Sequence, residues 1–135
     1  MKIGFIGLGN VGGKLAGSLL RNGFKLTVLD LDENLMQEFK KKGATLSNTP
    51  KELTESVDLI ITCLPSPEIC AEVMESSEGI LEGITKNKIW LEMSTTDESE
   101  VKRLGSLLSK KGGIPLDSPV SGGCHRAATG NIAIF

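Results

Sequence analysis

The chain has 135 residues, with 15 Lys and Arg against 17 Asp and Glu, and therefore a formal net charge of −2. This length fits one domain that buries its own core without disulfide or metal staples. The near-neutral balance argues against a nucleic-acid or membrane partner, and no apolar run approaches the roughly 20 residues of a membrane-spanning helix.

Cysteine and histidine usage narrows the class of protein further. The chain has three cysteines without CxxC spacing and one histidine, so we expect reduced thiols and no metal site. The first residues, Met-Lys-Ile-Gly-Phe-Ile-Gly, are too short and too glycine-rich for the core of a signal peptide. Together these features predict an intracellular, cytoplasmic domain.

Short apolar runs alternate with amphipathic segments along the chain. The runs are bounded by Gly or Pro, and the amphipathic segments follow a capping residue such as Asp32, Thr49, Ser66 or Asp97. In chain order we expect strand 2–6, helix 10–21, strand 26–29, helix 33–42, helix 50–56, strand 59–64, helix 67–74, strand 89–93, helix 98–111, strand 114–117 and strand 132–135.

This alternation over short loops is typical of repeated βαβ units. The predicted fold class is α/β, a Rossmann-type, doubly wound and mostly parallel sheet with helices on both faces. In such a sheet, ligands bind at the carboxyl ends of the strands.

A glycine-rich motif lies at the end of the first predicted strand. Residues 7–12 read Gly-Leu-Gly-Asn-Val-Gly, which is G-x-G-x-x-G between a strand and an amphipathic helix. In that context Gly7 permits a tight turn, Gly9 lets a pyrophosphate approach the backbone, and Gly12 lets the helix pack closely on the strand. A glycine-rich turn without a ligand is the less favoured interpretation.

Asp30 ends the second predicted strand. A carboxylate there accepts hydrogen bonds from the ribose hydroxyls of adenosine and repels a 2′-phosphate, and the next residues, Leu31 and Asp32, provide no arginine. Asp32 suits the role of helix cap better, which leaves Asp30 for the ribose. We therefore expect NAD as cofactor, with NADP possible.

Two later segments also follow strands and face the same edge of the sheet. Residues 63–66 and 94–96 carry hydroxyls and backbone groups that suit the nicotinamide and its ribose, although residues 94–97 also suit helix capping. The segment 117–123, Asp-Ser-Pro-Val-Ser-Gly-Gly, clusters donors that suit a carboxylate. A flexible turn is an equally good interpretation of that segment.

Residues 3–12, the Leu64-Pro65 turn and the segment 117–123 together resemble the β-hydroxyacid dehydrogenase family, over the whole chain and in the family's order. Its members include 3-hydroxyisobutyrate dehydrogenase and, more distantly, 6-phosphogluconate dehydrogenase. The glycine-rich start is shared with many dinucleotide-binding proteins, whereas Pro-Val-Ser-Gly-Gly is far more specific.

The resemblance implies a role for each matching residue. The expected pyrophosphate site is Gly7, Leu8, Gly9, Asn10, Val11 and Gly12. Asp30 faces the adenosine ribose, and the residues lining the nicotinamide side are Leu64, Pro65 and Thr95. The carboxylate of a small 3-hydroxy acid is held by Ser121, Gly122 and Gly123. His125 and Arg126 are expected in a loop, exposed and not catalytic.

The family's general acid/base, a lysine in a G-x-x-x-K-x-x-x-N pattern, has no counterpart in this sequence. The chain ends within the apolar residues 132–135, so we expect residues 1–135 to be the dinucleotide-binding domain of a longer, homo-oligomeric enzyme whose helical C-terminal domain lies outside this chain. Alone, the domain should bind NAD and be almost inactive. The alternative is a non-catalytic dinucleotide-binding or interaction module.

Overall fold

The structure is a computed structural model that describes residues 1–94, 97–118, 120–121, 123–130 and 133–134, with backbone only at 120–121, 123–125 and 133–134. The strands are β1 (Ile3–Ile6), β2 (Leu26–Leu29), β3 (Thr45–Leu46), β4 (Leu59–Thr62), β5 (Ile89–Glu92), β6 (Ile114–Asp117), β7 (Val120–Ser121) and β8 (Ala133–Ile134). The helices are α1 (Asn10–Arg21), α2 (Glu33–Lys41), α3 (Pro50–Ser56), α4 (Pro67–Glu75), α5 (Ile80–Gly83), α6 (Glu98–Lys110) and α7 (Gly123–Thr129).

Six strands form one parallel sheet in the order β3-β2-β1-β4-β5-β6. The chain starts at the centre, runs to one edge through β2 and β3, and then returns to build β4, β5 and β6 on the other side of β1. The direction of winding therefore changes between β1 and β4, which is the switch point of a doubly wound sheet. The predicted Rossmann-type α/β class is confirmed.

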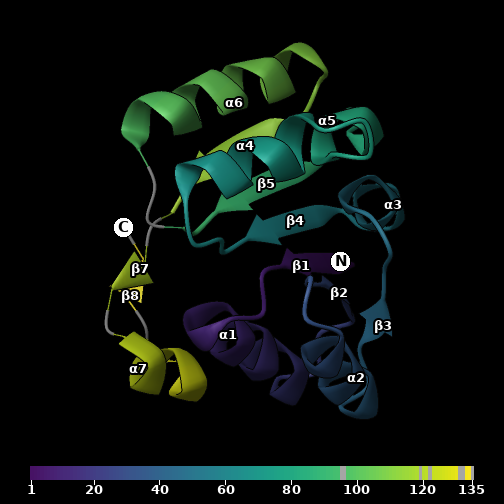
Figure 1. The fold of residues 1–135 in the computed structure, drawn as a ribbon, viewed down its shortest axis with the longest axis vertical. Helices are drawn as coiled ribbons and strands as arrows, with labels where there is room; N and C mark the ends of the chain where they lie inside the picture. The colour runs from purple at the N-terminus through teal and green to yellow at the C-terminus, as the bar shows by residue number, and fades with distance from the viewer. Residues whose placement is uncertain (95–96, 119, 122, 131–132, 135) are drawn as a thin grey trace.

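Helices cover both faces of the sheet (Figure 1): α1 and α2 lie on one face, and α4, α5 and α6 on the other. Adjacent strand residues point to opposite faces, so Phe5 belongs to the core under α1 and α2, and Ile6 to the core under α3–α6. Trp90 is fully buried in the second core, where its Nε1 donates to Thr62 Oγ1 at 2.9 Å. The two cores hold the strand ends in fixed positions, which is what a binding site at that edge requires.

Side-chain caps set the starts of four helices, as predicted. Asp32 accepts from the backbone N–H groups of Asn34 and Leu35, at 2.9 and 3.3 Å. Thr49, Ser66 and Asp97 cap α3, α4 and α6 in the same way. Asp97, rather than Ser94, is therefore the cap of α6.

Two short elements of the main sheet and its covering layers were not predicted from sequence, and the two-residue strand β7 was not predicted either. The strand β3 has 2 residues and the helix α5 has 4, which is too short for a period of 2 or 3.6 to be recognised. Both elements extend a layer of the fold: β3 adds a strand to the sheet beyond β2, and α5 packs against α3 and α4.

The C-terminal part differs from the prediction. A strand was expected at 132–135; the described residues Ala133–Ile134 form β8, which pairs antiparallel with β7 in a separate two-stranded sheet. The prediction of a loop at 124–126 is wrong, because Gly123–Thr129 form helix α7. This helix packs against α1 (Figure 1): Ala127 is fully buried, and the Arg21 guanidinium donates to the Ala128 carbonyl. Arg126 is exposed, as expected.

Among the described residues, no helix combines the length and the apolar character needed to cross a membrane.

Candidate cofactor-binding site

A cleft of about 850 Å³ opens at the carboxyl ends of β1, β2, β4 and β5. It spans the switch point between β1 and β4, where the fold places ligands. The loops after these four strands form its floor, and α4 forms part of its wall. Its lining residues are Ile6, Gly7, Gly9, Asn10, Val11, Gly12, Leu29, Asp30, Leu31, Asn48, Pro50, Cys63, Leu64, Pro65, Ile69, Glu72, Val73, Ser76, Met93 and Ser94.

The three glycines of the β1–α1 loop are required for different reasons. Gly7 has a φ of +101°, and a Cβ on it would overlap the Cys63 carbonyl. A Cβ on Gly12 would overlap the Gly7 carbonyl. A Cβ on Gly9 would meet nothing within 4 Å. The fold therefore needs glycine at 7 and 12 for its own packing, whereas at Gly9 the missing side chain leaves room in the cleft itself.

The start of α1 is the electropositive part of this cleft. Its N-cap is Gly9, which provides no side-chain acceptor, and its first turn contains no acidic residue. In contrast, α2, α3, α4 and α6 each have a capping side chain and an acidic first turn. The first N–H groups of α1 and the positive end of its dipole are thus left for an anionic ligand.

Asp30 lies at one end of the cleft, directly after β2. Its Oδ2 accepts from the backbone N–H of Leu8 at 2.7 Å, and its Oδ1 accepts from the N–H of Asp32 at 2.8 Å. The next residue, Leu31, is fully exposed. The carboxylate is held by two backbone donors, and each of its oxygens keeps a second lone pair for hydroxyl groups of a ligand.

Residues after β4 and β5 form the other end. The backbone N–H of Leu64 donates to Ser94 Oγ at 2.7 Å, which joins the two loops. Pro65 and Met93 line the cleft beside them. Burial, and secondarily Glu92, raise the pKa of the Cys63 thiol to about 11, so this cysteine is neutral at physiological pH and unsuited to nucleophilic chemistry.

Eight of the predicted site residues line this single cleft: Gly7, Gly9, Asn10, Val11, Gly12, Asp30, Leu64 and Pro65. Leu8 is 2% exposed and packs in the core, so only its backbone takes part, through Asp30. Thr95 and Gly122 lie outside the described residues. Ser121 ends β7 and Gly123 begins α7, and their roles remain predictions.

Sequence reasoning missed the wall that α4 contributes. Ile69, Glu72 and Val73 of α4 line the cleft at the spacing i, i+3, i+4 of one helix face, and Ser76, the residue after the helix, lines it as well. That spacing is visible in the sequence once the helix is placed after the Leu64-Pro65 turn. Two further lining residues are Asn48, in the β3–α3 connection, and Pro50, the first residue of α3, and no sequence pattern points to a role for them in the cleft.

Residues 2–135 match the family described as the NAD binding domain of 6-phosphogluconate dehydrogenase. The chain belongs to this family. It is 38% identical over 133 residues to the mitochondrial 3-hydroxyisobutyrate dehydrogenase of Mus musculus, covering 98% of this chain and 40% of that protein. It is 33% identical over 134 residues to the cytokine-like nuclear factor N-PAC of Pongo abelii, covering 99% of this chain and 24% of that protein.

Among solved structures, a similar one is the Mycobacterium tuberculosis 3-hydroxyisobutyrate dehydrogenase with L-serine. Its TM-score is 0.91 at 25% identity, over 98% of this chain and 45% of that one. The chain thus spans about 40% of the length of the curated 3-hydroxyisobutyrate dehydrogenases it matches.

These findings confirm the resemblance to the β-hydroxyacid dehydrogenases. The chain is an NAD-binding domain of the kind found in 3-hydroxyisobutyrate-dehydrogenase-like oxidoreductases. The predicted cytoplasmic location is wrong, since the relatives from mouse, rat and human are all named as mitochondrial 3-hydroxyisobutyrate dehydrogenases. Residue composition does not distinguish the two compartments, because both keep thiols reduced.

Proposed function

We propose that this chain binds NAD in the cleft and serves as the cofactor domain of an oxidoreductase acting on a small 3-hydroxy acid. Bound there, NAD would supply the chemistry of hydride transfer to or from the hydroxyl carbon of the substrate. The proposal rests on one observation: the uncapped start of α1, Asp30 and the Leu64-Pro65 turn all line the same cleft.

Each part of the cleft has a task in this proposal. The backbone of residues 7–12 and the start of α1 bind the pyrophosphate, for which Gly9 leaves space. The Asp30 carboxylate accepts hydrogen bonds from the ribose hydroxyls of adenosine. Leu64 and Pro65 line the nicotinamide side, since they follow β4, on the far side of β1 from Asp30. The family resemblance adds Thr95 to this side.

NAD is the proposed cofactor in preference to NADP. The carboxylate of Asp30 repels a 2′-phosphate, and the side chain of the exposed Leu31 beside it offers neither a charge nor a hydrogen-bond donor to a phosphate. A basic side chain at position 31 would be the simplest way to accommodate NADP.

The substrate side of the proposal rests on the family resemblance. Ser121, Gly122 and Gly123 would hold the substrate carboxylate, and a lysine outside this chain would move the hydroxyl proton. Residues 1–135 would then be the dinucleotide-binding domain of a homo-oligomeric enzyme with a helical second domain. The 135 residues by themselves should turn over almost nothing.

A non-catalytic dinucleotide-binding or interaction module is the second candidate. It is favoured by the similarity to N-PAC, a relative named as a nuclear factor rather than a dehydrogenase. The coding sequence after codon 135 separates the two candidates. A helical continuation with a G-x-x-x-K-x-x-x-N pattern supports the enzyme, and a stop codon supports the module.

Isothermal titration of the chain with NAD⁺ and NADP⁺ tests the cofactor proposal. We expect saturable NAD⁺ binding that is tighter than NADP⁺ binding, and no turnover of 3-hydroxyisobutyrate. Failure to bind either dinucleotide at millimolar concentration would overturn the proposed function, and dehydrogenase activity of the chain alone would overturn the need for a further lysine.

A further inference from the structure

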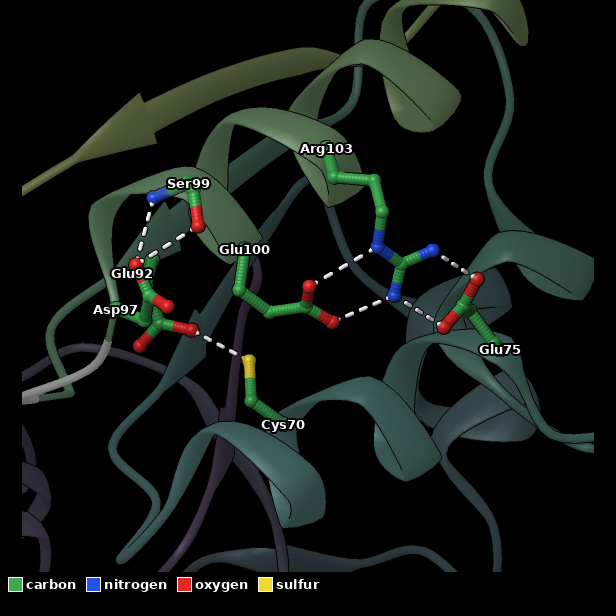
Figure 2. Close-up of polar contacts among 7 residues, drawn as sticks. All are labelled: Cys70, Glu75, Glu92, Asp97, Ser99, Glu100 and Arg103. Atoms are coloured by element: carbon green, nitrogen blue, oxygen red, sulfur yellow. Dashed lines mark hydrogen bonds and ion pairs between the residues drawn. The ribbon is translucent and has the colours of Figure 1, made fainter.

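Glu92, the last residue of β5, is a carboxylate in the core. Its side chain is 0% exposed. One carboxylate oxygen, Oε1, accepts from the backbone N–H of Ser94 at 2.6 Å. The other, Oε2, accepts from the thiol of Cys70 on α4 at 2.8 Å, as Figure 2 shows. Burying a carboxylate is costly, and an apolar side chain of similar size would serve packing alone at lower cost.

The Ser94 contact continues to the wall of the cleft. Ser94 is 4% exposed, and its Oγ accepts from the backbone N–H of Leu64 at 2.7 Å. The series Glu92, Ser94, Leu64 thus links the end of β5 to the turn after β4 through two short hydrogen bonds. Ser94 and Leu64 line the cleft, whereas Glu92 lies behind them.

We propose that Glu92 is a positioning residue for the nicotinamide half of the cofactor. It orients the backbone of Ser94, and through the Ser94 hydroxyl it holds the Leu64-Pro65 turn against the cleft. This inference rests on the proposed function and adds a residue that does not itself line the cleft.

Strand order explains why only one half of the cofactor depends on this series. Asp30 follows β2 on one side of β1, and the glycine-rich loop follows β1 itself. Leu64 and Ser94 follow β4 and β5 on the other side. Loss of the series should therefore leave the adenosine and pyrophosphate contacts unchanged.

The Cys70 contact provides a matched control. Cys70 is 1% exposed, and burial and Glu92 together hold the pKa of its thiol well above the usual range, so the thiol stays protonated and donates. Because the Cys70 thiol binds Oε2 of Glu92, replacing Cys70 leaves the hydrogen bond from Ser94 to Oε1 in place. Its helix is also held to α6 by a bidentate Arg103–Glu75 pair at 2.7 Å (Figure 2).

The experiment compares NADH with ADP-ribose, which lacks the nicotinamide, by isothermal titration of wild type and variants. Glu92→Met removes both acceptors. Glu92→Gln keeps an amide oxygen for Ser94 and turns its NH₂ toward sulfur, a weak acceptor. We expect Glu92→Met and Ser94→Ala to weaken NADH binding about tenfold while ADP-ribose binding stays within about twofold.

Three further results are expected. Glu92→Gln and Cys70→Ala should keep the wild-type ratio of NADH to ADP-ribose affinity. The double variant Glu92→Met/Ser94→Ala should weaken NADH no more than Ser94→Ala does, because the two residues act in series. If circular dichroism shows that Glu92→Met does not fold, the NADH and ADP-ribose affinities of Ser94→Ala decide the test.

The inference is overturned if both ligands weaken equally, or if NADH affinity is unchanged in Ser94→Ala. A wild-type chain that binds neither ligand would instead overturn the proposed function on which the inference rests.

Discussion

The carboxylate of Asp30 accepts a hydrogen bond from the backbone N–H of Leu8 at 2.7 Å, across 22 positions of sequence. This contact joins the end of β2 to the glycine-rich loop after β1. The position of the acidic group relative to the loop is therefore set before any ligand arrives. A residue expected to contact ribose thus also shapes the loop expected to contact the pyrophosphate.

Replacement of Asp30 should consequently affect both affinity and stability. Asp30→Ala removes the acceptors for the Leu8 and Asp32 N–H groups, so we expect a loss of about 1–3 kcal/mol in the free energy of unfolding. NAD⁺ affinity should fall at least about tenfold, while the preference over NADP⁺ disappears. Urea unfolding and titration with both dinucleotides measure these effects. An unchanged NAD⁺ to NADP⁺ ratio would contradict the charge argument.

Alanine substitutions separate the two kinds of glycine in the β1–α1 loop. Gly9→Ala places its Cβ in open space, so stability should fall by less than about 1 kcal/mol, while NAD⁺ binding falls at least about tenfold. Gly12→Ala forces its Cβ onto the Gly7 carbonyl and should cost about 1–3 kcal/mol.

The control for these variants is Gly17→Ala, the same change on the cleft-distant part of α1, where the nearest atom is the flexible Arg21 Nη1 at 3.4 Å. It should leave NAD⁺ binding unchanged. Equal losses of binding in the Gly9 and Gly17 variants would show that helix stability, and not space in the cleft, governs affinity.

The alkylation rate of the Cys63 thiol should measure both its burial and the occupancy of the cleft by NAD⁺. Because its pKa is raised to about 11, its alkylation by iodoacetamide at pH 8 should be about 100-fold slower than in the urea-unfolded chain. Saturating NAD⁺ should slow it further, since Cys63 lines the cleft. Peptide mapping by mass spectrometry follows this residue separately from Cys70. A native rate within tenfold of the unfolded rate would refute the assigned burial.

The Arg103 pairs should make stability depend on pH and salt. Arg103 bonds Glu75 on α4 and Glu100 on α6, and these bonds hold the pKa of both carboxyls below the usual value (Figure 2). A lowered pKa in the folded state means that the stabilisation is present above the ordinary carboxyl pKa and is lost as pH falls through the folded value.

Arg103→Met should therefore lower the Tm by a few degrees at pH 7, and the difference from wild type should vanish toward pH 3 and shrink in 1 M salt. Lys102→Met is the control, because its pair with Glu98 lies within α6 and joins no second element. Circular dichroism melts across this pH range measure both variants. A constant Tm difference at all pH values would mean that Arg103 acts through packing.

Local sequence patterns predicted much of the fold. The G-x-G-x-x-G loop, the caps at Asp32, Thr49, Ser66 and Asp97 and the apolar runs predicted most strands and helices, because capping and side-chain periodicity are properties of neighbouring residues. The short elements β3, α5 and β7, and the helix at Gly123–Thr129, were missed, since such elements are stabilised by what they pack against.

The sequence by itself determined the α/β class, the glycine loop and the acidic residue after β2, since each is encoded within one βαβ unit. Only the tertiary structure decided that Ile69 and Val73 of α4 line the same cleft as Asp30, and that Glu92 turns inward to Ser94 and Cys70. Those relationships depend on the order of strands in the sheet and on how α4 packs over it. The packing of the two buried cores brings these residues together, and no pattern of neighbouring residues in the sequence predicts that packing.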